Sequence, residues 1–489
     1  MKLRIGVVAA AAAALIAAGC GGSAGGNEPG SGGAMIAPGT TAAYMSVDSN
    51  LDSAAWTKAK ALLDRFPGKD DLIADLRSSL RQEGLDWETD VAPAIGDELD
   101  LVWLDFQNEG ENAVGMTKPD DAAKFDALLA KTENPPVHEV IDGWTVFAES
   151  RALLDRFDKA RADSGTLQDE STFGDHFDNL AGDSIARAWV RGGPLQAAFD
   201  KRLRSAGVPG VTTTSQFGAV DALTAAVTPQ SEGIQISSTA SGDLNDPGDS
   251  YHADLPTAVP GGAILYLSFN DVGTRINKLI DSLGSSVSNF DQQRAQIELV
   301  LGYPLSDVFN LLSGEGALAV YENKGGTPAV LFVADLSDES KAQNILNRLA
   351  SLAEASGTLE VQPVQIGSVQ AKEIALGNGR SLYVAIFDGR LVTATSRSAI
   401  EDMQGNGPKL ADDAVFKDAV SAADMPDQTH GFLYADTQEV LEYGFDYAAS
   451  GGMTVPQGVK ENTAPLRGLL LHSSKDGSDF TVTGFVGIK

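Results

Sequence analysis

The sequence predicts an α+β fold made of two tandem homologous domains, each a mainly antiparallel sheet with packed helices. Three observations lead to this prediction: motifs recur in the same order in both halves, Asp-Gly turns join neighbouring strands, and helical stretches separate the strand pairs. Strands that pair locally while helices intervene favour α+β over a doubly wound parallel sheet. The 489 residues are enough for two large domains, each with its own core.

The N-terminus has the pattern of an export signal followed by a tether. Lys2 and Arg4 precede an apolar run over residues 5–18, which is shorter than the ~20 residues that a membrane-spanning helix needs. Residues 1–19 are therefore predicted to be a signal peptide. Residues 20–36 are rich in Gly, Ser and Ala, and we expect them to form a flexible tether.

The end of this apolar run resembles the lipobox of bacterial lipoproteins. Small residues stand directly before Cys20, the only cysteine in the chain, although Ala17 occupies the position where that box usually has Leu. The resemblance implies cleavage before Cys20 and lipid chains on this residue, so the expected contact with the membrane is an N-terminal lipid anchor. The alternative is an incidental cysteine after an ordinary signal peptide.

Internal repeats define the two predicted domains, residues 37–243 and 258–489, with a linker at 244–257 that is rich in Asp, Pro and Gly. The matches keep their order along the chain. They are Pro38-Gly39-x4-Tyr44-x-Ser46 with Pro260-Gly261-x4-Tyr266-x-Ser268, then Asp142-Gly143 through Ser150-Arg151 with Asp388-Gly389 through Ser396-Arg397, and then Leu167, Asp169, Phe173 and Asp175 with Leu410, Asp412, Phe416 and Asp418.

The expected elements follow the same order in each domain. Strands are expected at 42–47, 98–106 and 112–117, then at 263–269, 317–322 and 328–335, and helices at 53–66, 69–83 and 117–131, then at 271–283, 291–301 and 337–352. Asp120 and Ser337 are predicted N-caps. Asp-Gly readily adopts positive φ, so hairpins are expected at Asp142-Gly143 and Asp388-Gly389, and a third at residues 475–478.

The lipobox, the Pro-Gly-x4-Tyr-x-Ser opening and the duplicated hairpin that ends in Ser-Arg together resemble domain-of-unknown-function family 3352. Its members are mostly exported or membrane-attached proteins of actinobacteria and related groups. The resemblance would cover nearly all of the mature chain and implies an envelope location. It implies no activity, because the family has no established catalytic residues.

The charge balance excludes one large class of partner. The chain has 36 Lys+Arg against 67 Asp+Glu, a net charge of −31, and no basic stretch that could neutralise phosphates, so no nucleic-acid binding is expected. No phosphate-binding glycine loop occurs either, so no nucleotide is expected. Anionic lipid should repel such an acidic body, so attachment to the membrane is expected to depend on the acyl chains.

No catalytic residue, metal site or cofactor is predicted. The five histidines lack metal-ligand spacing, and Gly182-x-Ser184-x-Ala186 opens a strand rather than a helix, unlike a nucleophile elbow. Residues 48–52 alternate acidic and polar residues in a calcium-like rhythm, but the glycine and the terminal glutamate of an EF-hand loop are missing. Residues 243–249 are acidic and could bind calcium weakly, although a solvated linker is the favoured interpretation.

Four residues are the candidates for ligand contact. Arg151 and Arg397 each follow a serine that is expected to cap a helix, and each could pair with a nearby acid or bind an anionic group. Tyr44 and Tyr266 lie on predicted strand faces that could line a cleft between the domains, or could be ordinary half-exposed faces.

Taken together, the sequence favours a non-enzymatic, lipid-anchored extracytoplasmic protein, acting as a binding or structural module of the cell envelope that captures a hydrophobic ligand or a partner protein. Two alternatives remain open. One is an envelope hydrolase whose catalytic groups are scattered along the chain, and the other is a calcium-dependent surface or adhesion module.

Overall fold

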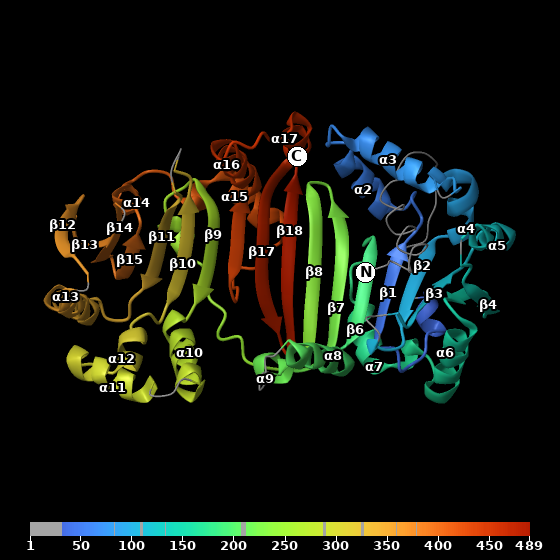
Figure 1. The fold of residues 1–489 in the computed structure, drawn as a ribbon, viewed down its shortest axis with the longest axis horizontal. Coiled ribbons are helices and arrows are strands. Elements are labelled where there is room, and N and C mark those ends of the chain that lie inside the picture. The colour runs from blue at the N-terminus through green and yellow to red at the C-terminus, as the bar shows by residue number, and fades with distance from the viewer. Residues whose placement is uncertain are drawn as a thin grey trace.

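The computed structural model describes residues 32–489 except 83, 108–110, 133, 207–211, 287–289, 324–326, 358 and 378. Cys20, the predicted signal peptide and residues 20–31 of the predicted tether lie outside the described residues. All of the described strands belong to one 18-stranded antiparallel sheet, which extends through the whole length of the molecule (Figure 1). The predicted α+β class with antiparallel pairing is confirmed.

The strand order of the first half of the sheet recurs in the second half. From its outer edge inward, the first half has the order β4 (Val137–Ile141), β5 (Trp144–Ala148), β3 (Ala113–Thr117), β2 (Glu98–Trp103), β1 (Ala43–Asp48), β6 (Ala186–Arg191), β7 (Gly218–Gln230) and β8 (Gly233–Leu244). The second half has the order β14 (Arg380–Phe387), β15 (Arg390–Ala394), β11 (Ala329–Asp335), β10 (Glu315–Tyr321), β9 (Ala263–Asn270), β16 (Phe432–Asp436), β17 (Leu466–Asp476) and β18 (Asp479–Ile488), with β13 (Val369–Gly377) and β12 (Val361–Ile366) added at its outer edge.

The two halves meet where β8 pairs with β18, and at the middle of this pair Ser237 lies opposite Thr483. β8 is the innermost strand of the first half and β18 is the innermost strand of the second half. Because the two strands pair antiparallel, the two halves are related by an approximate two-fold axis perpendicular to the sheet. We expected a separate sheet in each half. The two inner edge strands instead satisfy each other's backbone N–H and C=O groups, which removes two exposed sheet edges.

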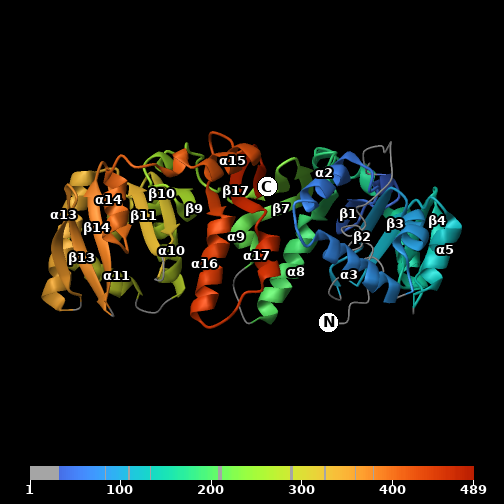
Figure 2. The same cartoon turned by 90° about the horizontal axis from the view of Figure 1, so that it is seen from above.

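Helices cover both faces of the sheet toward its two ends. The back face carries α6 (Arg151–Ser164), α7 (Ser171–Phe177), α14 (Arg397–Gln404) and α15 (Ala414–Ala422). The front face carries α2 (Ala54–Leu63), α3 (Lys69–Gln82), α4 (Ala92–Ile95), α5 (Ala122–Ala130), α10 (Val272–Ser286), α11 (Phe290–Leu301), α12 (Leu305–Phe309) and α13 (Glu339–Ser356) (Figures 1 and 2). Four further helices lie near the centre: α8 (Gly192–Ser205), α9 (Thr213–Phe217), α16 (Thr437–Ser450) and α17 (Gln457–Thr463).

The apolar core is divided between the two faces. On the back face, Tyr44 packs edge-on against Phe173 and Phe177 in the first half, and Tyr266 packs near Phe432 in the second half. On the front face, Trp56 and Trp87 are part of a smaller cluster in the first half, with its counterpart around α13 in the second half. Residues 42–47 and 263–269, predicted as strands, therefore direct their tyrosines into the back-face cores.

The sequence predicted the positions of the turns more accurately than the first residues of the helices. Asp142 and Asp388 have φ of 50° and 52° and join β4 to β5 and β14 to β15, so both Asp-Gly hairpins are confirmed. The helix caps are one residue later than predicted. Asp121 caps α5 in place of Asp120, and Asp338 caps α13 in place of Ser337, because these carboxylates accept hydrogen bonds from backbone N–H groups of the first helical turn.

Residues 251–257, half of the segment predicted as a linker, pack against the second half. Tyr251 is 8% exposed and forms an isolated β-bridge with Thr429. Its hydroxyl lies 2.7 Å from the Ser268 hydroxyl on β9. Leu255, in a short 3-10 helix (Leu255–Thr257), is fully buried in the second-half core. This segment therefore connects β8 to β9 as a packed element.

Phe485→Ala should destabilise the protein by about 3–5 kcal/mol, because the ring is 2% exposed on the strand that joins the two halves. Urea unfolding followed by circular dichroism measures this change. Leu376→Ala, at a side chain that is 54% exposed, is the control and should change the free energy of unfolding by about 0.5 kcal/mol or less. Equal effects of the two substitutions would contradict the assignment of Phe485 to the core.

Candidate functional site

The centre of the sheet has buried polar residues on its covered face and exposed aliphatic residues on the opposite face. An antiparallel sheet with one covered face usually places apolar residues under the cover and polar residues toward water. On β7 and β17 the back-facing Thr224, Thr228 and His472 are buried, and α7 and α15 pack on this side. Buried Ala226 and Leu470 share this back face. The front-facing residues that alternate with them are mostly aliphatic, apart from Ser473 and Lys475 of β17. These exposed aliphatic residues mark the front of the central strands as a candidate binding surface.

We call this surface the central platform. Its members share one face of the four inner strands, carry no charge and are all partly exposed, and Ile236, Val482 and Leu471 are 49%, 41% and 38% exposed. The platform consists of Leu223, Ala225, Val227, Ile234, Ile236, Ser238, Val482, Val486, Leu469 and Leu471. Contiguous exposed apolar surface of this kind is typical of binding sites.

Helices stand around the platform without covering it. In Figure 1 the central strands are free of helices in front, with α16 and α17 toward one end of the strands and α8 and α9 toward the other. The two halves are also tied together at one end. The Gly68 amide after α2 donates to Asn462 of α17 over 2.5 Å, and Arg65 donates to the backbone oxygens of Ser231 and Ile488. The platform is therefore a bordered surface rather than a closed pocket.

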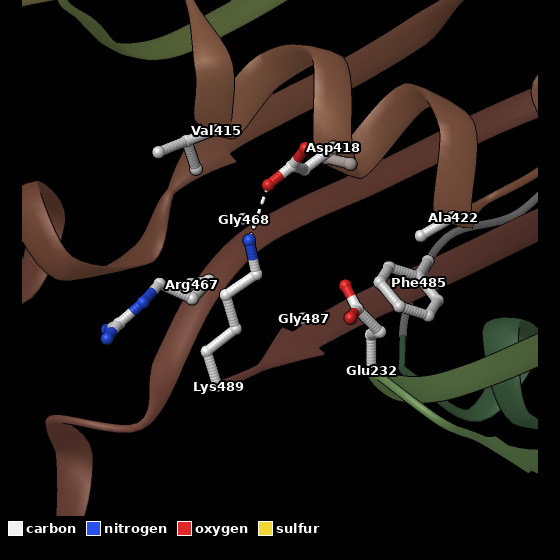
Figure 3. Close-up of a pocket in the computed structure, with 10 residues that line it drawn as sticks. Glu232, Val415, Asp418, Ala422, Arg467, Gly468, Phe485, Gly487 and Lys489 are labelled. Atoms are coloured by element: carbon white, nitrogen blue, oxygen red, sulfur yellow. Dashed lines mark hydrogen bonds and ion pairs between the residues drawn. The ribbon is translucent and has the colours of Figure 1, made fainter.

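Two concave sites lie near the platform, and one of them is very small. Figure 3 shows the first, under α15 on the back face, with Phe485 at one side and Lys489 directed toward Asp418. Its volume of about 30 Å³ corresponds to roughly one water molecule. The second is a groove of about 300 Å³ between α16 and α17, where Leu441 and Phe445 lie beside Lys460. Only the groove reaches the size range of small-molecule sites.

A serine–glutamate pair occurs in each half of the sheet, partly buried in the first half and buried in the second. Ser46 donates to Glu98 over 3.2 Å, and Ser268 donates to Glu315 over 2.9 Å. Glu315 also accepts the backbone N–H groups of Asp254 and Leu255 at 2.7 and 2.8 Å, which holds the segment before β9 on the sheet. Burial raises the pKa of both glutamates. The serines belong to the repeated motif of the sequence, whereas the glutamates were not predicted.

The first half adds a second buried acid. Asp100 is fully buried, and neither of its carboxylate oxygens has a hydrogen-bond partner. Burial, followed by the charge of Glu98, raises the pKa of Asp100 well above its usual range. A side chain on Gly33 would collide with this carboxylate, because its Cβ would lie 1.9 Å from Oδ2. Ala317 stands at the corresponding place in the second half, opposite Ser268.

The structure places both candidate arginines in ion pairs at helix starts. Arg151 lies 2.5 Å from Glu139, and Arg397 lies 2.8 Å from Glu373. Ser150 and Ser396 cap α6 and α14 by accepting a backbone N–H of the first turn. The two arginines are 54% and 48% exposed at the side chain and lie in opposite halves, so the structure does not bring them together.

The candidate tyrosines lie inside the protein. Tyr44 and Tyr266 are both 0% exposed and belong to different core clusters. Their hydroxyls have no hydrogen-bond partner, and burial raises the pKa of each. Neither lines the cavity of Figure 3 or the groove beside α16.

The residues considered for metal or nucleophile chemistry have local partners. Ser184 is 1% exposed, and its hydroxyl lies 2.7 Å from that of Thr228. Asp48 is 2% exposed, and its carboxylate accepts the Ser53 hydroxyl at 2.5 Å and the Asn50 amide at 2.9 Å; burial raises the pKa of Asp48 to about 6. Across the part of the chain that the structure describes, no group of three or more His, Cys, Asp and Glu side chains could hold a metal ion.

Sequence reasoning missed the central platform, although a signal for it was present. In β17, Leu469 and Leu471 alternate with Leu470 and His472, so apolar residues occupy both faces of one strand. In β8, Ile234 and Ile236 alternate with Gln235 and Ser237. This alternation identifies strands, but it does not reveal which face a helix covers.

Comparison with known proteins gives a family and a weak structural likeness. A family model described as "Protein of unknown function (DUF3352)" matches residues 122–484. No curated protein sequence matches the chain. Two solved structures, "Structure of crystal form IV of TP0453" and "Structure of crystal form III of TP0453", are 11% and 10% identical to it, with TM-scores of 0.26 and 0.25. They cover 49% and 48% of this chain and 94% of their own chains.

Asp100→Asn should stabilise the protein at neutral pH and flatten the dependence of its stability on pH. The folded-state pKa of Asp100 is raised, so the folded protein keeps a proton that the unfolded chain has released. The free energy of unfolding therefore falls as pH rises above about 4, the unfolded pKa of Asp, toward the folded one. Urea unfolding at several pH values measures this slope, with Asp70→Asn, at an exposed side chain, as the control. An unchanged slope would contradict the prediction.

Proposed function

We propose that this chain, which belongs to the DUF3352 family of proteins of unknown function, is a non-enzymatic binding module of the cell envelope. In this proposal a lipid anchor at Cys20 holds the protein outside the cytoplasm, and the central platform captures an apolar component of the envelope. The observation that carries the proposal is the set of exposed aliphatic side chains on the uncovered face of the four inner strands.

The extent of the platform supports a ligand larger than a metabolite. Four strands about 4.8 Å apart span roughly 20 Å, and the seven residues from Leu223 to Pro229 span roughly 24 Å. The resulting area of several hundred Å² is at the upper end of what monomeric proteins leave exposed without a function. Each methylene group buried there contributes about 0.8 kcal/mol. Acyl chains suit this surface because the platform residues carry no charge, and the hydroxyl side chains on this face are Ser238 and, opposite Val482, Ser473.

The repeated strand order supports the proposal that two homologous domains form the protein. The residues that face each other at the join, Ser237 and Thr483, occupy the same place in their halves, since β8 and β18 each follow a tight hairpin turn. A duplication of this kind produces the platform from two equivalent hairpins, β7–β8 and β17–β18.

A variant with Ile236, Leu471 and Val482 changed to Ser should lose ligand. Each change removes exposed aliphatic surface from the platform, and together they should lower affinity by at least about tenfold. The test compares native with denaturing mass spectra of protein purified from an envelope, where a bound molecule appears as extra mass in the native spectrum alone.

The matched control changes Val140, Leu359 and Leu376 to Ser. These side chains are also exposed, but they lie toward the outer ends of the sheet, so this variant should keep the extra mass. Extra mass that persists in the platform variant, or that never occurs in the natural protein, would contradict capture by the platform. Extraction of the bound molecule identifies its class.

A further inference from the structure

Two helices project from the sheet on the side of the platform. Figure 2 shows α8 and α16 extending away from the central strands in the same direction. No residue of α16 is buried, and Gly192 is the only buried residue of α8. Surface helices normally bury one apolar stripe against a core, so helices without such a stripe have their side chains available to a partner.

The tip of α8 is basic in an otherwise acidic protein. Lys201, Arg202 and Arg204 are exposed in its last two turns, whereas the whole chain carries a net charge of −31. Phe199, one turn earlier, is 53% exposed. The adjacent Asp200 accepts the backbone N–H and the hydroxyl of Thr213, so α9 engages this carboxylate. The tip therefore presents three cations together with an aromatic ring.

The tip of α16 is uncharged. Residues 447–455, which form its last turn and the following loop, contain no acidic or basic residue. Tyr447 and Met453 are 71% and 63% exposed there. The acidic residues of this helix, Glu439, Glu442 and Asp446, lie nearer its base. The two projecting tips thus combine aromatic and apolar side chains with positive charge.

We propose that the tips of α8 and α16 dock on the surface of an anionic lipid bilayer, with the central platform facing it. Aromatic and basic side chains are the types that settle at the boundary between headgroups and acyl chains. Basic residues near an anionic surface strengthen binding further. The net charge of −31 is spread over the whole body, which an anionic surface repels, whereas the cations at the tip of α8 lie closest to the headgroups, within a Debye length of about 10 Å.

The distances fit such an orientation. Each helix has 14 residues, about 21 Å of helix, so the tips hold the platform roughly 20 Å from the bilayer surface. From Cys20 to Gly32, the first described residue, 12 residues span about 40 Å at most, which keeps the body within reach of the membrane. Among the described residues no helix is long and apolar enough to cross a bilayer, so the contact is peripheral.

Site-specific fluorescence on the full-length protein tests this orientation. An environment-sensitive fluorophore is attached to a single cysteine introduced in place of Leu203, Tyr447 or Lys417. The unsubstituted chain is treated in the same way and measures how much fluorophore reacts with Cys20. Lys417 lies on α15 of the back face and is the control position. Vesicles contain phosphatidylcholine alone or with phosphatidylglycerol. We expect a blue shift at positions 203 and 447, no shift at 417, and stronger binding when phosphatidylglycerol is present.

Charge reversal separates docking from simple anchoring. Arg202→Glu with Arg204→Glu should weaken the phosphatidylglycerol-dependent binding by at least about tenfold, whereas Lys159→Glu with Arg380→Glu, at exposed positions away from the tips, should leave it nearly unchanged. Equal shifts at all three labels, no shift at either tip, or equal losses in the two charge variants would overturn the proposal.

Docking and ligand capture can fail separately. The variant with Ile236, Leu471 and Val482 changed to Ser should keep the blue shift at both tips, because the platform lies at the base of the helices. Loss of bound ligand with an unchanged shift would support docking by the tips. Loss of the shift in this variant would show that the platform itself makes the contact and would overturn docking by the tips.

Discussion

The antiparallel pairing of β8 with β18 is the constraint on which the rest of the structure depends. These strands come from opposite halves of the chain, and their hydrogen bonds turn two sheets into one. The Thr239 and Thr481 hydroxyls, 2.8 Å apart, add a side-chain contact across the same join. The pairing places two long hairpins side by side, and these four strands form the central platform.

Much of the local structure could be predicted from the sequence, because the deciding interactions are short in range. The Asp142 and Asp388 turns, the Ser150 and Ser396 caps and the alternation around Tyr44 each depend on residues a few positions apart. The family was also predictable from such motifs, and the match over residues 122–484 confirms it. The caps at Asp121 and Asp338 were missed by one residue, because in each case two candidate capping residues are adjacent in the sequence.

The candidate site could not be predicted in the same way, because it depends on which face a distant element covers. Nothing near Ile236 in the sequence indicates that α15 packs on the opposite face of the neighbouring strands. The half-buried Glu98 and the buried Glu315 are similar cases, since an acidic residue in a strand is usually expected to face solvent. The serines belong to a motif that recurs in both halves of the sequence. The glutamates to which they donate lie on another strand, so the sequence did not indicate these pairs.

The position of β18 also has a consequence for how the protein folds during its synthesis. It is the last strand of the chain, yet it lies in the middle of the sheet and pairs with a strand made much earlier. While the chain emerges N-terminus first, β8 has an open edge until the final residues arrive, and open edges attract other strands. Folding of the centre therefore waits until residues 479–488 have been made, and loss of these residues would remove the joint between the two halves.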